Sequence, residues 1–296
     1  MFFYTLMKTI GRELAESTIA FQTDLPPADI RILDMCMAPG GFLETALVKL
    51  PKSTATAFTL PVTSGGHEVL LPSYIKRRVK EIHVDITMLA KDMGIDSIPD
   101  DHPEANDFLP QNFHPDLQFD LVICDGQVLR THERLSYRER LEAMRLTTAQ
   151  LALGLEHLRP GGTMIVLLHG LDSYKTVRLL WDFSRFSFVQ VHKPQSKAAH
   201  QKKSSFYMVA SYVNSSDPAA LECIARWKAR WKEATFGSHE HFLAIYENEL
   251  KDLDDILETF GPQLVRFGKD VWNVQAKALE VLVANLDYKA KKQAEK

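Results

Sequence analysis

Residues 34–42 read DMCMAPGGF, and this short stretch predicts the fold of the chain on both sides of it. An apolar strand is expected just before it, over residues 31–35, and a helix just after it, over residues 42–50. Between the two, Gly40 and Gly41 allow backbone angles and close approaches that a Cβ atom would prevent. A strand-to-helix turn of this kind predicts a nucleotide-cofactor site, because ligands of α/β sheets bind beyond the carboxyl ends of the strands.

The spacing of the two glycines separates this turn from other nucleotide-binding turns. It is not the Gly-x-Gly-x-x-Gly pattern that favours NAD, and the sequence has no Gly-Lys-Ser/Thr phosphate loop. The second predicted strand ends near Thr59 and lacks the terminal acid that a dinucleotide enzyme would need. Considered alone, the turn from Ala38 through Pro39 to Gly41 could also be a tight connection that binds nothing.

Blocks of apolar residues with strand and helix spacing follow one another along the whole chain. The strands are expected at residues 31–35, 54–60, 81–86, 119–126, 163–168, 187–192 and 205–212. The helices are expected at residues 5–21, 42–50, 87–93, 135–158, 173–186, 219–235, 239–259 and 263–286. This order predicts an α/β fold with a mostly parallel seven-stranded sheet and helices on both faces. The last two strands have no helix between them, so they predict an antiparallel hairpin at the sheet edge.

Charge and cysteine content limit the partners that the chain could bind. The formal net charge of the 296 residues is −3, so no global positive field would attract nucleic acid, and any RNA contact would rest on a local patch. The three cysteines, Cys36, Cys124 and Cys223, lack the spacing of a metal site or of a disulfide framework. We therefore expect reduced thiols and no metal cofactor.

The N-terminal apolar run does not resemble a targeting segment. Residues 1–7 are too short for a secretory signal core and are followed at once by Lys8 and Arg12. No segment reaches the roughly 18 apolar residues that are needed to span a bilayer. We expect an intracellular protein, cytoplasmic or nuclear, with no membrane partner.

Further motifs follow the turn in a particular order. They are VDIT at residues 84–87, FDLVICDG at 119–126, LRPGG at 158–162, and Lys193-Pro194 leading to FYMVA at 206–210. Together with DMCMAPGGF, this series resembles the FtsJ/RrmJ family of methyltransferases between residues 30 and 213. The resemblance implies a Rossmann-like methyltransferase fold, S-adenosylmethionine as the cofactor, and an RNA ribose 2′-hydroxyl as the usual acceptor.

The limits of this resemblance divide the chain into three predicted parts. Residues 1–29 would form an N-terminal helical segment, 30–213 an FtsJ-like methyltransferase domain, and 214–296 a C-terminal helical extension. Because the extension lies outside the resemblance, it could cap the cleft, form a dimer or bind a protein partner.

The resemblance also implies which residues bind the cofactor. Gly40, Gly41 and Phe42 would line its methionine and ribose side, Asp85 would lie by the adenine, and Asp125 would lie near the sulfonium. Opposite charges attract more strongly in a partly dry cleft than in water, so a carboxylate beside a sulfonium is favourable. The complete expected set is Asp34, Ala38, Pro39, Gly40, Gly41, Phe42, Thr59, Asp85, Ile86 and Asp125. From the residues alone, Asp85 could instead be a helix N-cap.

The family's Lys-Asp-Lys-Glu catalytic set is incomplete in this sequence. Asp125 matches the aspartate, but Leu167 stands at the position of the second lysine and Ser205 at that of the glutamate. Lys8 is the candidate for the first lysine, with a solvated surface lysine as the alternative. His169 follows at the end of the fifth predicted strand. It could be a general base, because histidine titrates near working pH, or it could be a structural residue.

A local basic face remains between residues 183 and 216, where no acidic residue occurs. Its lysines Lys193, Lys197, Lys202 and Lys203 are the predicted substrate-binding residues, because the matching hairpin of the family lies beside RNA. A solvated mobile loop is the alternative interpretation. The arginines and glutamates of residues 130–145 alternate, and we interpret that run as a solvated helix face.

These observations leave two hypotheses of different classes. The first is an S-adenosylmethionine-dependent methyltransferase with an altered catalytic set, acting on RNA or on a small molecule. The second is a catalytically impaired pseudo-methyltransferase that binds the cofactor and serves as a binding or regulatory module. Loss of the lysine and the glutamate with the turn intact would produce the second. An NAD-dependent oxidoreductase is disfavoured by the glycine spacing and by Thr59.

Overall fold

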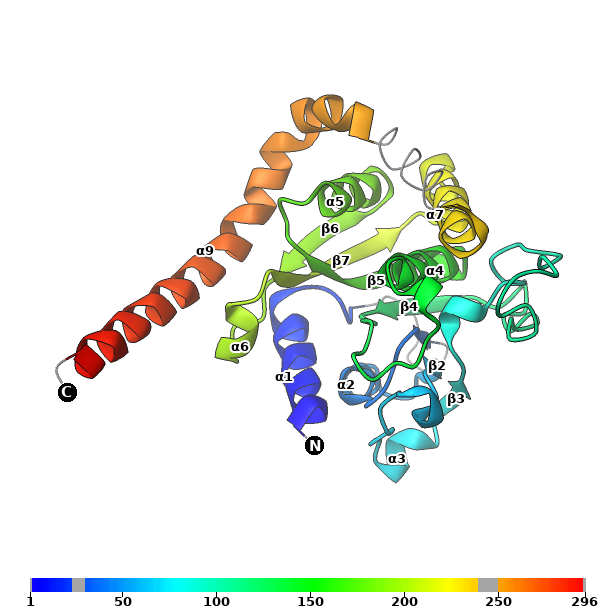
Figure 1. Ribbon diagram of the computed structural model, residues 1–296, viewed down its shortest axis with the longest axis horizontal. Helices are drawn as coiled ribbons and strands as arrows, with labels where there is room; N and C mark the ends of the chain where they lie inside the picture. Colours follow the sequence, from blue (N-terminus) through cyan, green and yellow to red (C-terminus); the bar gives the residue numbers. More distant parts are fainter. Residues whose placement is uncertain (1, 23–29, 239–249, 295–296) are drawn as a thin grey trace.

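Seven strands form one mixed sheet in the computed structural model, which describes residues 2–22, 30–238 and 250–294 (Figure 1). The strands are β1 Arg31–Asp34, β2 Thr54–Thr59, β3 Val79–His83, β4 Phe119–Cys124, β5 Leu158–His169, β6 Phe188–His192 and β7 Ser205–Val213. Their order across the sheet is β3-β2-β1-β4-β5-β7-β6. Neighbours from β3 to β5 are parallel, whereas β7 is antiparallel to both β5 and β6. The predicted mostly parallel sheet with an antiparallel edge hairpin is confirmed.

Helices cover both faces of this sheet (Figure 1). They are α1 Phe2–Ser17, α2 Gly41–Lys49, α3 Ser73–Lys76, α4 Glu142–Glu156, α5 Tyr174–Phe186, α6 Ala198–Gln201, α7 Pro218–Phe236 and α9 Leu253–Ala294. Short 3-10 turns occur at η2 Val62–Ser64, η3 Ile86–Met88, η4 Ser136–Arg138 and η5 Leu250–Asp252. Buried side chains of α1 and α2 form one apolar layer with Ile32, and those of α4, α5, α7 and α9 form the other with Leu33. Successive strand residues point to opposite faces, which explains the two layers.

The strand order of the sheet changes direction between β1 and β4, which makes this boundary the topological switch point. From β1 the chain continues outward to β2 and β3, then returns to β4 on the other side of β1. The loops after β1 and β4 therefore separate and leave a crevice at the carboxyl edge of the sheet. Asp34 pairs in register with Ile123, so Asp125 follows closely beside the end of β1.

The turn after β1 depends on glycine at two positions. Gly40 has a φ of +100°, a left-handed conformation that L side chains rarely adopt. Gly41 has no room for a side chain, because a Cβ atom would lie 2.1 Å from the carbonyl oxygen of Tyr4 in α1. The first helix therefore packs directly on the turn.

Replacing Gly41 with alanine should lower the free energy of unfolding by about 1–3 kcal/mol, the usual cost of overpacking a close contact. Gly261→Ala in α9 is the matched control, because no atom lies within 4 Å of the Cβ that it adds. Urea unfolding of both variants measures the effect. A Gly41→Ala protein as stable as the wild type would contradict the tight packing of α1 on the turn.

Several predicted element boundaries are wrong. The helix expected at residues 87–93 is only the turn η3, followed by irregular chain. The helix expected from residue 135 begins at Glu142. The strand β5 begins at Leu158, so the LRPGG motif lies inside it, and the register with β7 shifts between Gly162 and Met164. An irregular pairing of this kind has no clear signature in apolar periodicity.

The C-terminal region also differs from the prediction. Where the structure describes it, the region expected to hold two helices is the single helix α9, which continues through Pro262. The part of the first expected helix at residues 239–249 lies outside the described residues. The last turns of α9 project away from the sheet (Figure 1). In the described chain, none of the helices is long and apolar enough to cross a membrane.

Candidate functional site

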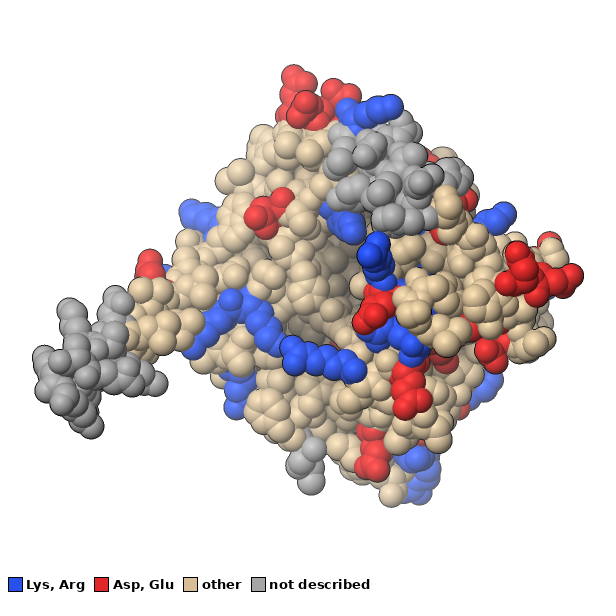
Figure 2. Space-filling view, viewed as in Figure 1, with Lys and Arg blue, Asp and Glu red and all other residues tan. Residues whose placement is uncertain are grey.

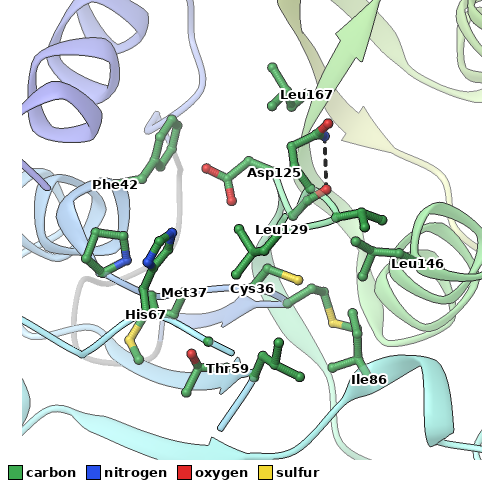
Figure 3. A pocket seen from close by; sticks show the side chains of 18 of the residues that line it. Cys36, Met37, Phe42, Thr59, His67, Ile86, Asp125, Leu129, Leu146 and Leu167 are labelled. Carbon is green, nitrogen blue, oxygen red and sulfur yellow. Dashed lines mark hydrogen bonds between the residues drawn. The ribbon is translucent and has the colours of Figure 1, made fainter. Parts of the chain in front are cut away.

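A cavity of about 350 Å³ opens at the carboxyl edge of the sheet, in the crevice between β1 and β4. Its walls come from the turn after β1, the ends of β2, β4 and β5, the turn η3, the start of β7 and the first turns of α1. Figure 3 shows the side chain of Asp125 in this cavity, with Phe42 across from it and Leu167 nearby. The cavity therefore forms where the sequence predicts a cofactor site.

Most of the predicted cofactor-binding residues line this cavity. They are Ala38, Pro39, Gly41, Phe42, Thr59, Asp85, Ile86 and Asp125. The other two support the turn instead. Asp34 is 1% exposed, and its carboxylate accepts a hydrogen bond from the backbone N–H of Cys36 at 3.1 Å. Gly40 precedes α2 in its left-handed conformation.

The carboxyl of Asp125 lines the cavity, and that of Asp34 lies beneath the neighbouring turn. Burial raises the pKa of Asp34 well above its usual range, and the charge of Asp125 raises it further. Burial also raises the pKa of Asp125 to about 7. Two negative charges this close are unfavourable without a cation between or beside them. The site is therefore prepared to gain electrostatic energy from a positively charged ligand.

Asp85 lies on the opposite side of the cavity, after β3. Its carboxylate caps η3 by accepting the N–H of Thr87 at 2.9 Å, so the N-cap interpretation of this residue is confirmed. It also pairs with Arg138 at 2.9 Å and lies 3.5 Å from His132. Burial opposes its ionisation, but His132 and Arg138 outweigh burial and hold the pKa of Asp85 below its usual range.

Arg138 is the centre of a buried ion-pair network beside the adenine end predicted for the cavity. It is 3% exposed and bonds to Glu142 at 2.7 Å and to Glu104 at 3.1 Å, in addition to Asp85. Arg145 is fully buried and lies 3.5 Å from Glu142. The expected solvated face at residues 130–145 is thus wrong for Arg138, Glu142 and Arg145, which are buried, whereas Arg130, Glu133, Glu139 and Arg140 are exposed. Spacing along the chain can show the pairs with Glu142, but it cannot show those of Arg138 with Asp85 and Glu104.

A possible metal-ligand set occurs within the same network. Asp85, His132 and Glu142 offer ligand atoms that all lie within 4.8 Å of one another. However, the Arg138 guanidinium donates to both carboxylates and so occupies the position of a cation. We therefore interpret the cluster as an ion-pair network.

Replacing Arg138 with methionine should lower the free energy of unfolding by about 3–5 kcal/mol, because buried carboxylates lose their partner. The loss should shrink as the pH is lowered toward 5, since protonation removes the unpaired charges. Urea unfolding at several pH values measures both effects. The exposed Arg140→Met is the control. An Arg138→Met protein with the stability of that control would contradict a structural role for the network.

The catalytic candidates do not all reach the cavity. Leu167, Ser205 and His169 line it together with Asp125, but Lys8 does not. Lys8 instead pairs with the buried carboxylate of Glu44 at 2.9 Å. Its predicted catalytic position is therefore not supported, and it joins α1 to α2.

His169 is held at the cavity by a neighbouring amide. Its Nε2 atom lies 3.0 Å from Oε1 of Gln127. Burial lowers the pKa of His169, and the positive charges of Lys203 and Lys193 lower it further. A lowered pKa favours the neutral imidazole, which is the form that can accept a proton.

The predicted basic face divides into one buried lysine and an exposed rim. Lys193 is 3% exposed and donates hydrogen bonds to the backbone carbonyls of Ser205, at 2.8 Å, and of Lys203. It therefore does not belong to the surface, which corrects its predicted contact with substrate. Lys197, Lys202 and Lys203 flank the short helix α6, and Lys203 lines the cavity. Figure 2 shows basic side chains around a hollow of the face that it views.

The segment that carries this rim is fixed at both ends. Glu13 of α1 accepts the backbone N–H groups of Gln195, at 2.6 Å, and Ser196, at 3.0 Å. Gln275 of α9 donates to the carbonyl of Lys202 at 3.3 Å. These contacts do not favour the mobile-loop alternative.

Sequence reasoning missed several residues of the site. Gln127, His132, Tyr207 and His67 all line the cavity. Tyr207 is in register with Leu167 across the β5–β7 pair, which follows from topology and not from local sequence. Gln127 directly follows Asp125-Gly126, and that proximity is the one signal that could have identified it.

Comparison with known proteins identifies a family for this chain. The sequence matches the FtsJ-like methyltransferase family over residues 14–211. None of the curated proteins matches it.

Similar solved structures all differ widely in sequence. N-methyltransferase NodS from Bradyrhizobium japonicum WM9 has a TM-score of 0.40 and 14% identity, over 68% of this chain and 93% of that one. An O-methyltransferase family protein from Burkholderia thailandensis has a TM-score of 0.37 and 10% identity, over 72% of this chain. The chain spans 59% of the length of that protein. TrmN from Thermus thermophilus has a TM-score of 0.34 and 14% identity, over 69% and 47% of the two chains.

Proposed function

The chain belongs to the FtsJ-like methyltransferase family, and from this premise we propose that it methylates the 2′-hydroxyl of RNA riboses. S-adenosylmethionine is its cofactor and supplies an electrophilic methyl group on a positively charged sulfur. The carboxyl of Asp125 in the cavity carries the proposal, because burial raises its pKa and a positively charged ligand beside it would stabilise its ionised form. Pro39, Gly41 and Phe42 of the turn line the same cavity, so the turn would contact a ligand bound there.

Each end of the cavity has a role in binding the cofactor. Asp125 would lie beside the sulfonium and lose its proton as the cation arrives. Asp34 stays beneath the turn and shapes it through the N–H of Cys36. Asp85 is held ionised and fixed by Arg138, so it can accept a hydrogen bond from the adenine amino group.

His169 would manage the proton of the acceptor. Its imidazole lines the cavity and would accept the proton that the acceptor hydroxyl loses when it is methylated. His169 would then be protonated and would have to release this proton before the next turnover. Leu167 and Ser205 provide no charged group for this step, whereas His169 lines the same cavity.

RNA is the acceptor that the rim favours. Lys197, Lys202 and Lys203 lie on a segment without acids, and Lys203 reaches the cavity. Lysines at such a rim attract phosphates and steer a polyanion to the site. A small-molecule acceptor would not need the two lysines that lie outside the cavity lining.

The second candidate is a pseudo-methyltransferase that binds the cofactor without transferring the methyl group. Leu167 and Ser205 favour it, because they replace two of the four catalytic groups of the family. In this candidate the cavity still binds the cofactor, but no acceptor is methylated.

The affinity for S-adenosylmethionine should increase as the pH rises from 6 to 8. Asp125 is protonated below its pKa of about 7, and only its ionised form attracts the sulfonium. The dissociation constant should therefore fall by up to about tenfold per pH unit below that pKa. Calorimetry measures it. S-adenosylhomocysteine, which has no sulfonium charge, and the Asp125→Asn variant should both show a weaker dependence. Absence of binding at sub-millimolar ligand would remove the cofactor assignment.

Replacing His169 with alanine should slow methyl transfer to RNA by about 10²–10⁴-fold, the usual contribution of a general base. The affinity for the cofactor should not change. The measurement is transfer of a labelled methyl group to unmodified RNA, with DNA of the same sequence as the control without 2′-hydroxyls. Unchanged turnover would eliminate the role of His169. Cofactor binding without transfer to RNA would overturn the RNA proposal, and the second candidate would require in addition that no small-molecule acceptor is methylated.

A further inference from the structure

A series of amide hydrogen bonds connects α4 to the end of β5 across the candidate site. It begins at Gln150, which is 3% exposed on α4. The side-chain Oε1 of Gln150 accepts the backbone N–H of Gly126 at 2.9 Å, and its Nε2 donates to the Gly126 carbonyl at 3.3 Å. The backbone N–H and the backbone carbonyl of Gly126, from two successive peptide groups, are therefore both hydrogen-bonded to one buried side chain.

Gly126 allows this arrangement because it has no side chain. A Cβ atom there would lie 2.3 Å from Sγ of Cys36 and 2.8 Å from Oε1 of Gln150. The loop after β4 is thus packed against the turn after β1 on one side and against α4 on the other. The position of the next residue, Gln127, follows from this packing.

The amide of Gln127 has a defined orientation. Its Nε2 donates to the Gly126 carbonyl at 3.0 Å, which turns Oε1 toward His169. That Oε1 lies 3.0 Å from Nε2, one of the two ring nitrogens of His169. A carbonyl oxygen can only accept, so the hydrogen of the neutral imidazole must be on Nε2. The lone pair is then on Nδ1.

We propose that Gln127 is a positioning residue that fixes the tautomer of His169 and makes Nδ1 the nitrogen that accepts the proton of the acceptor hydroxyl. This inference rests on the proposed role of His169 and deepens it. Gln127 does not receive the proton itself. It acts through the ring, in the way that a hydrogen-bond partner on one ring nitrogen sets the chemistry of the other.

The charged groups around His169 favour the neutral form of its imidazole, which can accept this proton. Lys203 and Lys193, from the segment between β6 and β7, both disfavour a second proton on the imidazole. His200 of α6 lines the same cavity and is subject to the same two lysines. Because these neighbours are cationic or neutral, the interaction that selects between the two ring nitrogens is the one with Gln127.

Two variants test the proposal by NMR of the ¹⁵N-labelled imidazoles in the full-length protein, with His169→Ala used to assign the signals. In the wild type at pH 8, the proton should be on Nε2 of His169. Gln127→Leu removes the acceptor, so the fraction with the proton on Nδ1 should rise. Gln127→Glu keeps an acceptor and adds a negative charge, so the titration of His169 should move upward by about one pH unit or more. The His132 signals are the internal control and should not move.

The same variants separate this inference from the proposed function. A wild-type proton on Nδ1, or a His169 titration that Gln127→Glu leaves unchanged, would overturn the role of Gln127 whatever the activity. If the NMR results hold, Gln127→Leu should lower kcat for RNA without changing KM for S-adenosylmethionine, and Gln127→Glu should move the rising limb of the pH profile upward. Normal kcat in both variants would contradict the role of the tautomer in catalysis.

Discussion

Two carboxyl groups lie near each other where the parallel strands β1 and β4 end side by side. Much of the site follows from the repulsion between their negative charges. Asp34 and Asp125 come together because β1 and β4 are parallel neighbours at the point where the sheet changes its direction of growth. Burial and the repulsion between the two carboxylates disfavour their full ionisation. A cation in the cavity removes that penalty, so the topology of the sheet creates a preference for a positively charged ligand.

The two sides of the cavity are prepared in different ways. On the side of η3, Arg138 and His132 hold Asp85 ionised within a buried network, which gives a fixed acceptor for a hydrogen bond. On the side of β5, the carboxyl edge carries His169 with cationic neighbours, and α1 and α9 hold the lysine-bearing segment near it. A cationic cofactor and an anionic acceptor would thus meet complementary potentials at opposite parts of one crevice.

The sequence was sufficient for features that depend on local pattern. The apolar strands, the glycine turn and the position of Asp125 follow from spacing alone, and motif order gave the family. Other features depend on contacts between distant segments. Arg138 reaches Asp85, which lies 53 residues earlier, and Lys193 is buried because two backbone carbonyls face it. Gln127 was missed because its function, as we propose it, lies in a partner on another strand. The division of the chain at residues 29 and 213 remains a proposal.

A crystal structure of the protein with S-adenosylhomocysteine would test the central claim most directly, because it would locate both ends of the cofactor at once. The account predicts that the sulfur lies beside the Asp125 carboxyl, that the adenine amino group bonds to Asp85, and that the homocysteine chain passes over Gly41. A ligand bound elsewhere on the protein, or in this cavity with its adenine beside Asp125 and its sulfur remote from it, would contradict the account.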